Sequence, residues 1–569
     1  MSKEKIKETA RIYALQNAVQ FNGKANSKAV VGKVIAVLQK EGFSPKEIVP
    51  IVNNVITEIN KIPLEKQISE LEKTAPELLK KEKKARDFSL PDLPEAVKGK
   101  VVTRFPPEPN GYLHIGHAKA AIIDHEYAKI YEGKFILRFD DTNPENAQLE
   151  FYDAQKEDLK WLGIKWDKEY NTSDHLETHY KLAEQLIKQG DAYVCECRSD
   201  KIKDHRFHGK ECECRCVASG ENLDAWKEML SSSNDVILRL RGDMACSNTA
   251  MRDPTLFRII ETPHPVHGDK YRVWPTYDFA GAVEDSLSGV THPFRTKEYE
   301  LRDECYFKLL ELLKLRKPYL MEFARLSIQG MPVSKRKIKP LIEKGAVSGY
   351  DDIRLPTLRG LKKRGILPEA IKQFVLSQGI SKVESTVDFG LVEAANRKVV
   401  DSTAKRYFFV KNPVKLKVEN APEKTKQISL HPDNTLGTRT VKTGKIFFIQ
   451  KSDLERLKIG DVFRLKDLFN VKITKAGKEV TAEYVGDNLI PDSLKIQWTT
   501  DKFIKMSVFV PHPLFTGEEY NADSLETVDG YAEEAVSQLK TDELVQFERF
   551  GFVRIENVNN KITGFFAHK

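Results

Sequence analysis

Apolar residues recur at helical spacing along the first part of the chain, up to about residue 75. They fall into two runs: Ile12, Leu15, Ala18 and Val19, then Val30, Val31, Val34 and Val37. This period predicts a helical N-terminal module, which either docks a partner protein or contacts RNA. A charged stretch follows from Leu78 to Arg86, and Pro91 and Pro94 close it. We therefore expect a domain boundary near residue 95.

The pattern changes between residues 99 and 140. A short apolar strand is followed by a loop, a helix and a second strand, and these elements are Val101–Phe105, Ala118–Tyr131 and Lys134–Phe139. Strands that alternate with helices predict a doubly wound α/β domain with a parallel sheet. Ligands bind at the carboxyl ends of such strands. His114, His117 and Asp140 fall at those ends.

Beyond about residue 400, short strand-like runs separated by turns dominate the pattern. The runs are Lys415–Val418, Lys445–Ile449, Val480–Tyr484, Leu494–Trp498, Lys505–Val510 and Gly551–Ile555. They predict one or two C-terminal β-barrels. Residues 346–400 keep a helical pattern and predict a helical connector, in which Leu358–Arg364 is basic on one side.

Length and charge narrow the class of protein. The chain has 569 residues, too long for one hydrophobic core. No apolar run approaches the roughly 20 residues that span a bilayer, and the N-terminus lacks an apolar signal core. We therefore expect a cytoplasmic protein without membrane contact. The net charge of +8 suits a polyanionic partner only where basic residues cluster.

Five of the seven cysteines lie between Cys195 and Cys216. Four of them form two C-x-C pairs: Cys195, Cys197, Cys212 and Cys214. Clustering in a large chain favours a metal over disulfides, and four thiolates suit a structural zinc ion. Alternative ligands are Cys216, His205 and His208. The competing interpretation is a set of reduced structural thiols, and we expect Cys246 and Cys305 to be ordinary buried thiols.

Two other motifs carry candidate chemistry. Arg104–His117 reads RFPPEPNGYLHIGH and places His114 and His117 three residues apart at a predicted helix start. Both histidines can face one ligand there, and the helix N-terminus offers donors to phosphates. Val333–Lys337 reads VSKRK and looks like a mobile basic loop. Taken alone, the histidines could equally be capping or core residues, and the basic segment an exposed loop.

Together these motifs resemble the class I aminoacyl-tRNA synthetases, specifically the glutamyl/glutaminyl branch. The similar segments are PPEPNGYLHIGHAK, LRFDDTNP, YDF, MRDP, VSKRK and Phe547-Glu548-Arg549. The resemblance runs from about Lys100 to the C-terminus, and the N-terminal segment is similar to the extension of archaeal-type glutamyl-tRNA synthetases. Val333 departs from the methionine of many members, but the lysine is retained.

The resemblance implies a multidomain protein with a Rossmann-like catalytic fold. The implied domains are a helical N-terminal extension (1–95), the first half of the catalytic fold (96–192), an inserted acceptor-stem-binding domain with the candidate zinc site (193–265), the second half of the catalytic fold (266–345), a helical connector (346–400) and anticodon-binding β-barrels (401–569).

The resemblance also implies a chemistry. ATP with Mg²⁺ would activate the amino acid, and the implied ATP-binding residues are His114, Gly116, His117, Arg325, Ser334 and Lys335. Among these, His114, His117 and Lys335 would be catalytic, with Lys335 reaching the departing phosphates as its loop closes. The implied amino-acid-binding residues are Arg104, Asp140, Tyr277 and Arg295, with Asp140 on the substrate ammonium group.

Charge decides between glutamate and glutamine, because the two are nearly isosteric. Arg295 aligns with an arginine of glutamyl enzymes, where glutaminyl enzymes carry a small neutral residue, and an arginine matches a buried carboxylate. We therefore expect a glutamate–tRNA ligase. Three alternatives stay open: a structural salt bridge from Arg295 to Glu298 or Glu300, a glutaminyl enzyme, and a non-catalytic RNA-binding protein on the same fold.

The implied partners are glutamate, ATP and tRNA(Glu). If tRNA(Gln) were a second acceptor, a tRNA-dependent amidotransferase would act downstream. Basic residues in Arg354–Arg364 and Lys335–Lys339 would follow the phosphate backbone. The C-terminal barrels would splay the anticodon bases.

Overall fold

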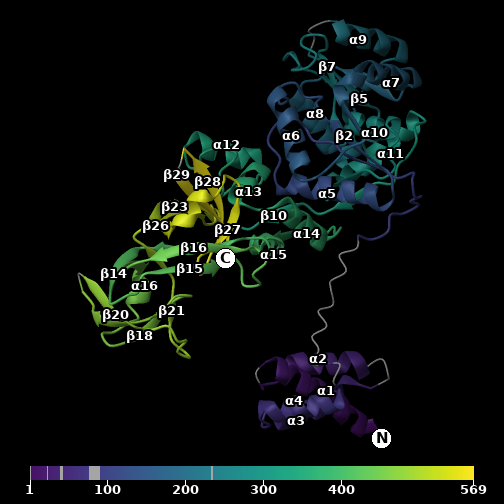
Figure 1. Cartoon of the computed structure of the whole chain (residues 1–569). Coiled ribbons are helices and arrows are strands. Elements are labelled where there is room, and N and C mark those ends of the chain that lie inside the picture. Colours follow the sequence, from purple (N-terminus) through teal and green to yellow (C-terminus); the bar gives the residue numbers. More distant parts are fainter. Residues whose placement is uncertain are drawn as a thin grey trace. The chain divides into compact units, whose positions relative to one another are not determined.

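The computed structural model of the chain describes residues 2–21, 23–38, 43–75, 78, 90–231, 235–477, 479–559 and 561–569. The chain forms two compact units, Met1–Phe88 and Ser89–Lys569 (Figure 1). Except for Leu78, the charged stretch that the sequence places before residue 87 lies outside the described residues. None of the described helices is long and apolar enough to cross a membrane.

The described part of the first unit contains four helices, and the apolar period predicts this helical module. They are α1 (Ser2–Gln20), α2 (Ser27–Leu38), α3 (Pro45–Ile59) and α4 (Leu64–Thr74). Small and branched apolar side chains such as Ala14, Val34 and Val52 fill the core between them. The buried Gln67 donates its amide to three backbone carbonyls, including those of Ile59 and Ile62 at 2.9 and 3.0 Å. It thereby adds a hydrogen bond to carbonyls at and just after the end of α3, where the helix offers fewer partners.

The catalytic part of the second unit begins with a parallel three-stranded sheet. Its strands are β1 (Val102–Phe105), β2 (Lys134–Phe139) and β3 (Lys168–Asn171), connected through α5 (Ile115–Ile130) and α6 (Leu149–Trp161). The predicted alternation of strand and helix and the parallel sheet are confirmed. Both the α5 N-terminus and Asp140 follow strand ends, so the chain brings them to one edge of the sheet.

An antiparallel sheet is inserted next. It consists of β4 (Ala192–Cys195), β5 (Ile237–Leu240), β6 (Thr255–Ile259) and β7 (Val273–Pro275). The helical segments before and within it are η3 (Thr172–His175), α7 (Leu176–Gln189), α8 (Ser199–His208), η4 (Glu213–Cys216), α9 (Ser219–Ser231) and η5 (Thr249–Met251). The chain then returns to the parallel fold through α10 (Tyr277–Leu287), β8 (Phe294–Thr296), η6 (Lys297–Arg302), α11 (Asp303–Leu312), β9 (Met321–Phe323) and β10 (Leu326–Ile328).

The connector and the VSKRK segment before it both differ from their predictions. The connector holds α13 (Leu358–Arg364), α14 (Pro368–Gln378) and α15 (Gly390–Val400), but also the strand β11 (Ser385–Val387), which pairs in parallel with β10. Two of the five basic residues of the segment Arg354–Arg364 are not available at the surface, because Arg354 is buried against Asp352 and Arg364 against Glu393, whereas Lys362 is exposed. The VSKRK segment is no loop either: Lys335 opens helix α12 (Lys335–Glu343), with Ser334 at the N-cap position.

The C-terminal region forms two seven-stranded, barrel-like sheets. The first contains β12 (Arg406–Tyr407), β13 (Phe409–Lys411), β23 (Phe503–Pro511), β26 (Leu525–Glu533), β27 (Leu544–Phe547), β28 (Gly551–Val558) and β29 (Lys561–His568). The second contains β14 (Pro413–Glu419), β17 (Ile446–Gln450), β18 (Val462–Leu465), β19 (Asn470–Lys475), β20 (Val480–Gly486), β21 (Lys495–Ile496) and β22 (Trp498–Thr500). The remaining elements are the hairpins β15–β16 (Lys424–Ser429, Thr438–Thr443) and β24–β25 (Phe515–Thr516, Glu519–Tyr520), α16 (Lys451–Leu454) and η7 (Glu534–Gln538).

The six strand predictions hold, with one interruption. The run Leu494–Trp498 breaks at Gln497, so that β21 and β22 lie at opposite edges of the second sheet. Ion pairs join the two sheets: Lys466 pairs with Glu548, and Arg549 with Asp453 at 2.7 Å. Glu548 and Arg549 of the Phe547-Glu548-Arg549 motif therefore connect the first sheet to the second through ion pairs.

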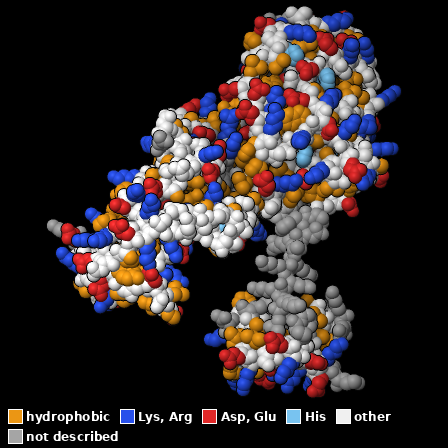
Figure 2. Space-filling view, viewed as in Figure 1, with side chains coloured by type: hydrophobic (Ala, Val, Ile, Leu, Met, Phe, Trp, Pro, Cys, Tyr) orange, Lys and Arg blue, Asp and Glu red, His pale blue; other side chains and the backbone are white. Residues whose placement is uncertain are grey.

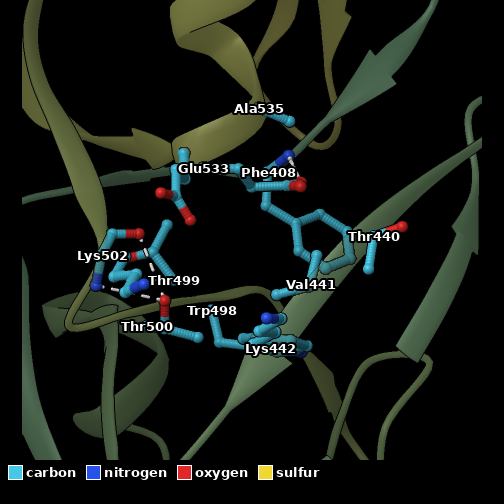
Figure 3. A pocket seen from close by; sticks show the side chains of 11 residues that line it. Phe408, Thr440, Val441, Lys442, Trp498, Thr499, Thr500, Lys502, Glu533 and Ala535 are labelled. Atoms are coloured by element: carbon cyan, nitrogen blue, oxygen red, sulfur yellow. Dashed lines mark hydrogen bonds between the residues drawn. The ribbon is translucent and has the colours of Figure 1, made fainter. Parts of the chain in front are cut away.

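A small pocket lies where the two sheets meet (Figure 3). Phe408, Trp498, Thr500 and Glu533 are among its lining residues. Its volume of about 20 Å³ has room for a water molecule and not for a nucleobase.

Candidate active site and cysteine cluster

The two histidines of the first motif lie at the start of α5. His114 is the N-cap residue and its Nδ1 accepts from the backbone N–H of Gly116 at 3.0 Å. His117 Nδ1 accepts from the backbone N–H of His114 at 3.3 Å. The two rings stack with centroids 3.8 Å apart. The histidines therefore act as caps, as one interpretation of the sequence had it, while their outer nitrogens stay available to a ligand.

Both histidine side chains are neutral at neutral pH, because their pKa values are lowered. Burial, together with the neighbouring His117 and Arg325, holds the pKa of His114 well below its ordinary value. Burial and Arg325 lower the pKa of His117 to about 4. Because each Nδ1 accepts a backbone hydrogen bond, the single ring proton belongs on Nε2. At neutral pH the site therefore presents two Nε2–H donors beside the amide groups of a helix N-terminus, which suits phosphate oxygens.

Gly116 is required by this geometry. A Cβ at this position would stand 2.8 Å from Cε1 of His114. We expect Gly116→Ala to displace the His114 ring and to lower kcat/KM in ATP–pyrophosphate exchange by about 10²-fold, since a misplacement near 1 Å has an effect of that size. Gly220→Ala is the matched control, because Gly220 is likewise the second residue of its helix and a Cβ there meets nothing within 4 Å. Equal rates for the two variants would contradict the assignment.

The second motif lies against the first. Lys335 Nζ donates to the backbone carbonyl of Asn110, a residue 225 positions away in the PPEPNGY loop. Arg325 pairs with Glu298 at 3.1 Å. Its charge lowers the pKa of both histidines, so Arg325 lies within electrostatic reach of them. The structure therefore brings His114, His117, Arg325 and Lys335 to one site.

The position of α12 depends on the C-terminal sheets. Ile338 of α12 packs in one apolar cluster with Leu514 and Leu355, and the backbone N–H of Phe515 donates to the carbonyl of Gly330 at 3.1 Å. A segment about 180 residues downstream thus supports the helix that carries Lys335. No pattern in the sequence signals this contact, because it joins segments that are distant along the chain.

Glu108 is a further residue of this site, which the sequence motifs did not single out. Burial raises the pKa of this carboxyl group, and the charges of Asp140 and Lys335 act on it from either side. It accepts from Asn146 at 3.2 Å. The signal in the sequence that could have indicated Glu108 is its position in the PPEPNGY segment, between Arg104 and His114.

Three of the predicted amino-acid-binding residues, Arg104, Tyr277 and Arg295, lie close to one another. Burial raises the pKa of Tyr277 to about 12, against the opposing charges of Arg104 and Arg295, so all three lie within electrostatic reach of one another. The ring of Tyr299 packs against that of Tyr277 in a tilted arrangement, with centroids 4.6 Å apart. Asp140 is partly exposed, and accepts from Arg138 and Thr172 at 2.8 Å each.

Arg295 lies in β8 and is almost fully buried. Its carboxylate partners are Asp303 and Glu322. The expected alternatives, Glu298 and Glu300, are wrong as partners, because Glu298 pairs with Arg325 and Glu300 with Lys382. Arg104 also has a partner, the buried Asp285, at 2.9 Å.

The four cysteines of the C-x-C pairs form one cluster. The Sγ atoms of Cys195, Cys197, Cys212 and Cys214 all lie within 4.8 Å of one another. Both cross-pairs, Cys195–Cys212 and Cys197–Cys214, have Sγ atoms 3.9 Å apart. Zinc–sulfur bonds of about 2.3 Å in a tetrahedron give sulfur–sulfur edges near 3.8 Å. The arrangement therefore fits a tetrahedral metal ion.

The surroundings of the cluster also suit metal-bound thiolates. Arg239 Nη1 points at the Sγ atoms of Cys195 and Cys212, at 3.8 and 3.7 Å. Contacts of this kind, from a cation to the sulfur atoms of metal ligands, stabilise the negative charge of metal-bound thiolates. The spare candidates Cys216, His205 and His208 lie outside this cluster of described residues. Cys305 is buried as expected, but Cys246 is only partly buried.

Comparison with known proteins finds relatives along the whole chain. Residues 100–402 match the family model for the class I tRNA synthetase (E and Q) catalytic domain, and residues 404–486 and 495–556 match two anti-codon binding domains of the same family. A glutamate–tRNA ligase of Nitrosopumilus maritimus is 46% identical over 570 residues, covering 100% of both chains. Those of Cenarchaeum symbiosum and Pyrococcus furiosus are each 43% identical, covering 96% and 99% of this chain and 97% and 100% of their own. The chain belongs to the class I tRNA synthetases of the E and Q group.

Proposed function

We propose that this chain is a glutamate–tRNA ligase, which activates glutamate with ATP and transfers it to the 3′ end of tRNA(Glu). The observation that carries the proposal is that two groups of side chains lie near each other, since the charges of both Asp140 and Lys335 act on Glu108. One holds the neutral histidine pair with Lys335, and the other holds Arg104, Tyr277 and Arg295. The first suits the phosphates of ATP and the second a buried carboxylate.

In the first step the α-carboxylate of glutamate attacks the α-phosphorus of ATP and pyrophosphate leaves. The Nε2–H groups of His114 and His117 donate to phosphate oxygens, and Lys335 approaches from the opposite side. These groups meet charge that grows in the transition state. Mg²⁺ bound to ATP neutralises part of the phosphate charge.

In the second step the 2′-hydroxyl of the terminal adenosine attacks the glutamyl carbonyl. AMP leaves and the hydroxyl proton is released. Asp140 holds the substrate ammonium group through both steps, while Arg295 and Arg104 face the side-chain carboxylate. Arg295 and Arg104 keep their own carboxylate partners, Asp303, Glu322 and Asp285. Their two positive charges attract the negatively charged side chain of glutamate more strongly than the neutral side chain of glutamine, which favours glutamate.

The C-terminal sheets are proposed to bind the anticodon, since they coincide with the anti-codon binding family models. On the face shown in Figure 2, basic and acidic side chains are interspersed over the second unit. The RNA contacts are therefore expected to be local clusters, and not one basic field. The proposed location is the cytoplasm, where tRNA and ATP are supplied.

We also propose a division of the chain into the domains that a glutamate–tRNA ligase requires. The catalytic fold is 96–192 and 266–345, with the antiparallel sheet at 193–265 as the acceptor-binding insertion. That sheet spans Ala192–Pro275, which supports the insertion but extends it by ten residues beyond the proposed end. The helical extension at 1–95, the connector at 346–400 and the barrels at 401–569 complete the division.

Aminoacylation tests the function and the choice of tRNA. Purified enzyme with ATP and Mg²⁺ is offered labelled glutamate or glutamine, with tRNA(Glu) and tRNA(Gln) in separate reactions. We expect glutamate on tRNA(Glu). Glutamate on tRNA(Gln) as well would add a non-discriminating activity and require a downstream amidotransferase. Transfer of glutamine, or of neither amino acid, would overturn the proposal.

We infer that Cys195, Cys197, Cys212 and Cys214 hold one structural zinc ion. Its chemistry would be to tie β4 to the segment around η4, and no reaction step passes through it. Reduced cysteines without metal would leave four mutually close thiols with no common partner, which is a poorer account of the convergence.

Zinc analysis of the purified enzyme is expected to give about one ion per chain. Cys197→Ser should lose most of that metal and lower the melting temperature, because a tetrahedral site with a missing thiolate binds zinc weakly. Cys216→Ser is the control, since Cys216 is exposed and lies outside the cluster. Metal-free wild-type enzyme, or unchanged zinc in Cys197→Ser, would refute the site.

A further inference from the structure

Four charged side chains of alternating sign form a continuous chain beneath the amino-acid pocket. They are Arg104, Asp285, Arg138 and Asp140. Arg104 donates to both carboxylate oxygens of Asp285, at 2.9 and 3.2 Å. Arg138 donates to Asp285 at 2.8 Å and to Asp140 at 2.8 Å. Asp285 therefore links the two arginines.

The sheet explains why these residues meet. Arg104 of β1 pairs in register with Ile136 of β2, and Arg138 lies two residues further along β2. Side chains two residues apart project from the same face of a strand, so both guanidinium groups lie on one face. Asp285 approaches that face from α10.

The chain is buried except at one end. Arg104, Asp285 and Arg138 are 3%, 1% and 1% exposed, whereas the Asp140 side chain keeps 19%. Burial by itself would raise the pKa of Asp285, but the charges of Arg104 and Arg138 outweigh it and hold that pKa below its ordinary value. Burial would likewise lower the pKa of Arg104, and Asp285 raises it instead. Asp285 thus carries a negative charge that keeps two buried cations in place.

Neighbouring groups fix each member of the chain. Phe294 O accepts from Arg104 Nη1 at 2.6 Å, and Tyr306 donates to Asp285 at 3.1 Å. Thr172 donates to Asp140 at 2.8 Å. These bonds leave Arg104 with one N–H on each of Nη1 and Nη2 that is free to meet a ligand.

We propose that Asp285 is a positioning residue for glutamate, which sets Arg104 and Asp140 at the spacing of the substrate's side-chain carboxylate and ammonium group. The inference rests on the proposed roles of Arg104 and Asp140 as substrate contacts. Bound glutamate closes the chain into a ring of alternating charges, because its carboxylate meets Arg104 and its ammonium group meets Asp140. Asp285 touches neither the substrate nor the reacting atoms.

The test compares two adjacent acids of one helix. Asp285→Asn removes the charge that links the arginines. Glu284→Gln is the matched control, since Glu284 is also fully buried on α10 but accepts from His175 and His179, at 3.1 and 2.7 Å. ATP–pyrophosphate exchange in the presence of tRNA measures KM for glutamate and for ATP in each variant, and thermal melting follows the fold.

We expect Asp285→Asn to raise KM for glutamate by about 10- to 10²-fold, as a misplaced contact does, with KM for ATP within about twofold. Glu284→Gln should melt earlier while KM for glutamate stays within about twofold. Unchanged KM for glutamate in Asp285→Asn, or a parallel rise for glutamate and ATP, would overturn the proposal.

Two further variants keep the outcome decisive. If Asp285→Asn does not fold, Tyr306→Phe removes one hydrogen bond to Asp285 without changing any charge. It should raise KM for glutamate several-fold with KM for ATP unchanged, and an unchanged KM for glutamate would overturn the inference.

Asp140→Asn separates this inference from the proposed function. If it too leaves KM for glutamate unchanged, the proposed amino-acid site is wrong. If Asp140→Asn raises KM and Asp285→Asn does not, only the role of Asp285 fails.

Discussion

Replacing Arg295 with glutamine is expected to lower kcat/KM for glutamate by about 10²- to 10³-fold, from the 3–5 kcal/mol lost when one partner of a buried ion pair is removed. Arg295 is 6% exposed, so water cannot replace it. Its removal also leaves Asp303 and Glu322 to repel the incoming carboxylate. Glutamine carries no such charge, so its activation should change much less.

The ratio of kcat/KM for glutamate to that for glutamine measures this effect in ATP–pyrophosphate exchange. We expect the ratio to fall by at least about tenfold in Arg295→Gln, because only one of the two substrates loses a charge partner. Arg272→Gln is the control, since it breaks a peripheral ion pair with Glu261. A ratio that stays at the wild-type value would mean that Arg295 is only a structural partner of its two carboxylates.

The second large effect is expected from Lys335→Ala, which should lower kcat of glutamate activation by about 10²- to 10³-fold, the size of losing one charge-stabilising donor. Lys335 lies at the N-terminus of α12 and its ammonium group donates to the carbonyl of Asn110, in the PPEPNGY loop that leads to the histidine pair. Charge on the departing phosphates grows in the transition state, so kcat should fall more than KM for ATP rises.

Lys339→Ala on the same helix is the matched control for this variant. The Lys339 side chain is 63% exposed and its nearest carboxylate is Glu343, at 3.7 Å, one turn along α12. We expect rates close to those of the wild type. Similar losses in both variants would show that general charge on α12, and not the ammonium group of Lys335, supports activation.

Local patterns in the sequence were sufficient to predict the N-terminal helices, the β1–α5–β2 unit and the C-terminal strands. The alternation from Val101 to Phe139 predicted the β1–α5–β2 unit, because each element buries one face with its own period. The C-x-C pairs predicted that four cysteines converge, since short spacing and thiol chemistry restrict the arrangement. The resemblance supplied the remaining site residues, which composition and periodicity alone left open.

Contacts between distant segments could not be predicted. Asp285 sits in an apolar helix, and nothing near it in sequence shows that it holds Arg104 and Arg138, which are 181 and 147 positions away. Arg354 and Arg364 looked like a phosphate-binding surface because a run of basic residues is usually exposed, but Asp352 and Glu393 bury them. Lys335 looked like part of a loop, while packing of Ile338 against Leu514 stabilises a helix.

A crystal structure with a non-hydrolysable glutamyl-adenylate analogue tests the central claim most directly. The account predicts the side-chain carboxylate of the analogue within hydrogen-bond distance of Arg295 or Arg104, its ammonium group on Asp140, and its phosphate-like group facing Nε2 of His114 or His117. An analogue whose carboxylate contacts neither arginine, or whose adenylate lies away from the histidine pair, would contradict it.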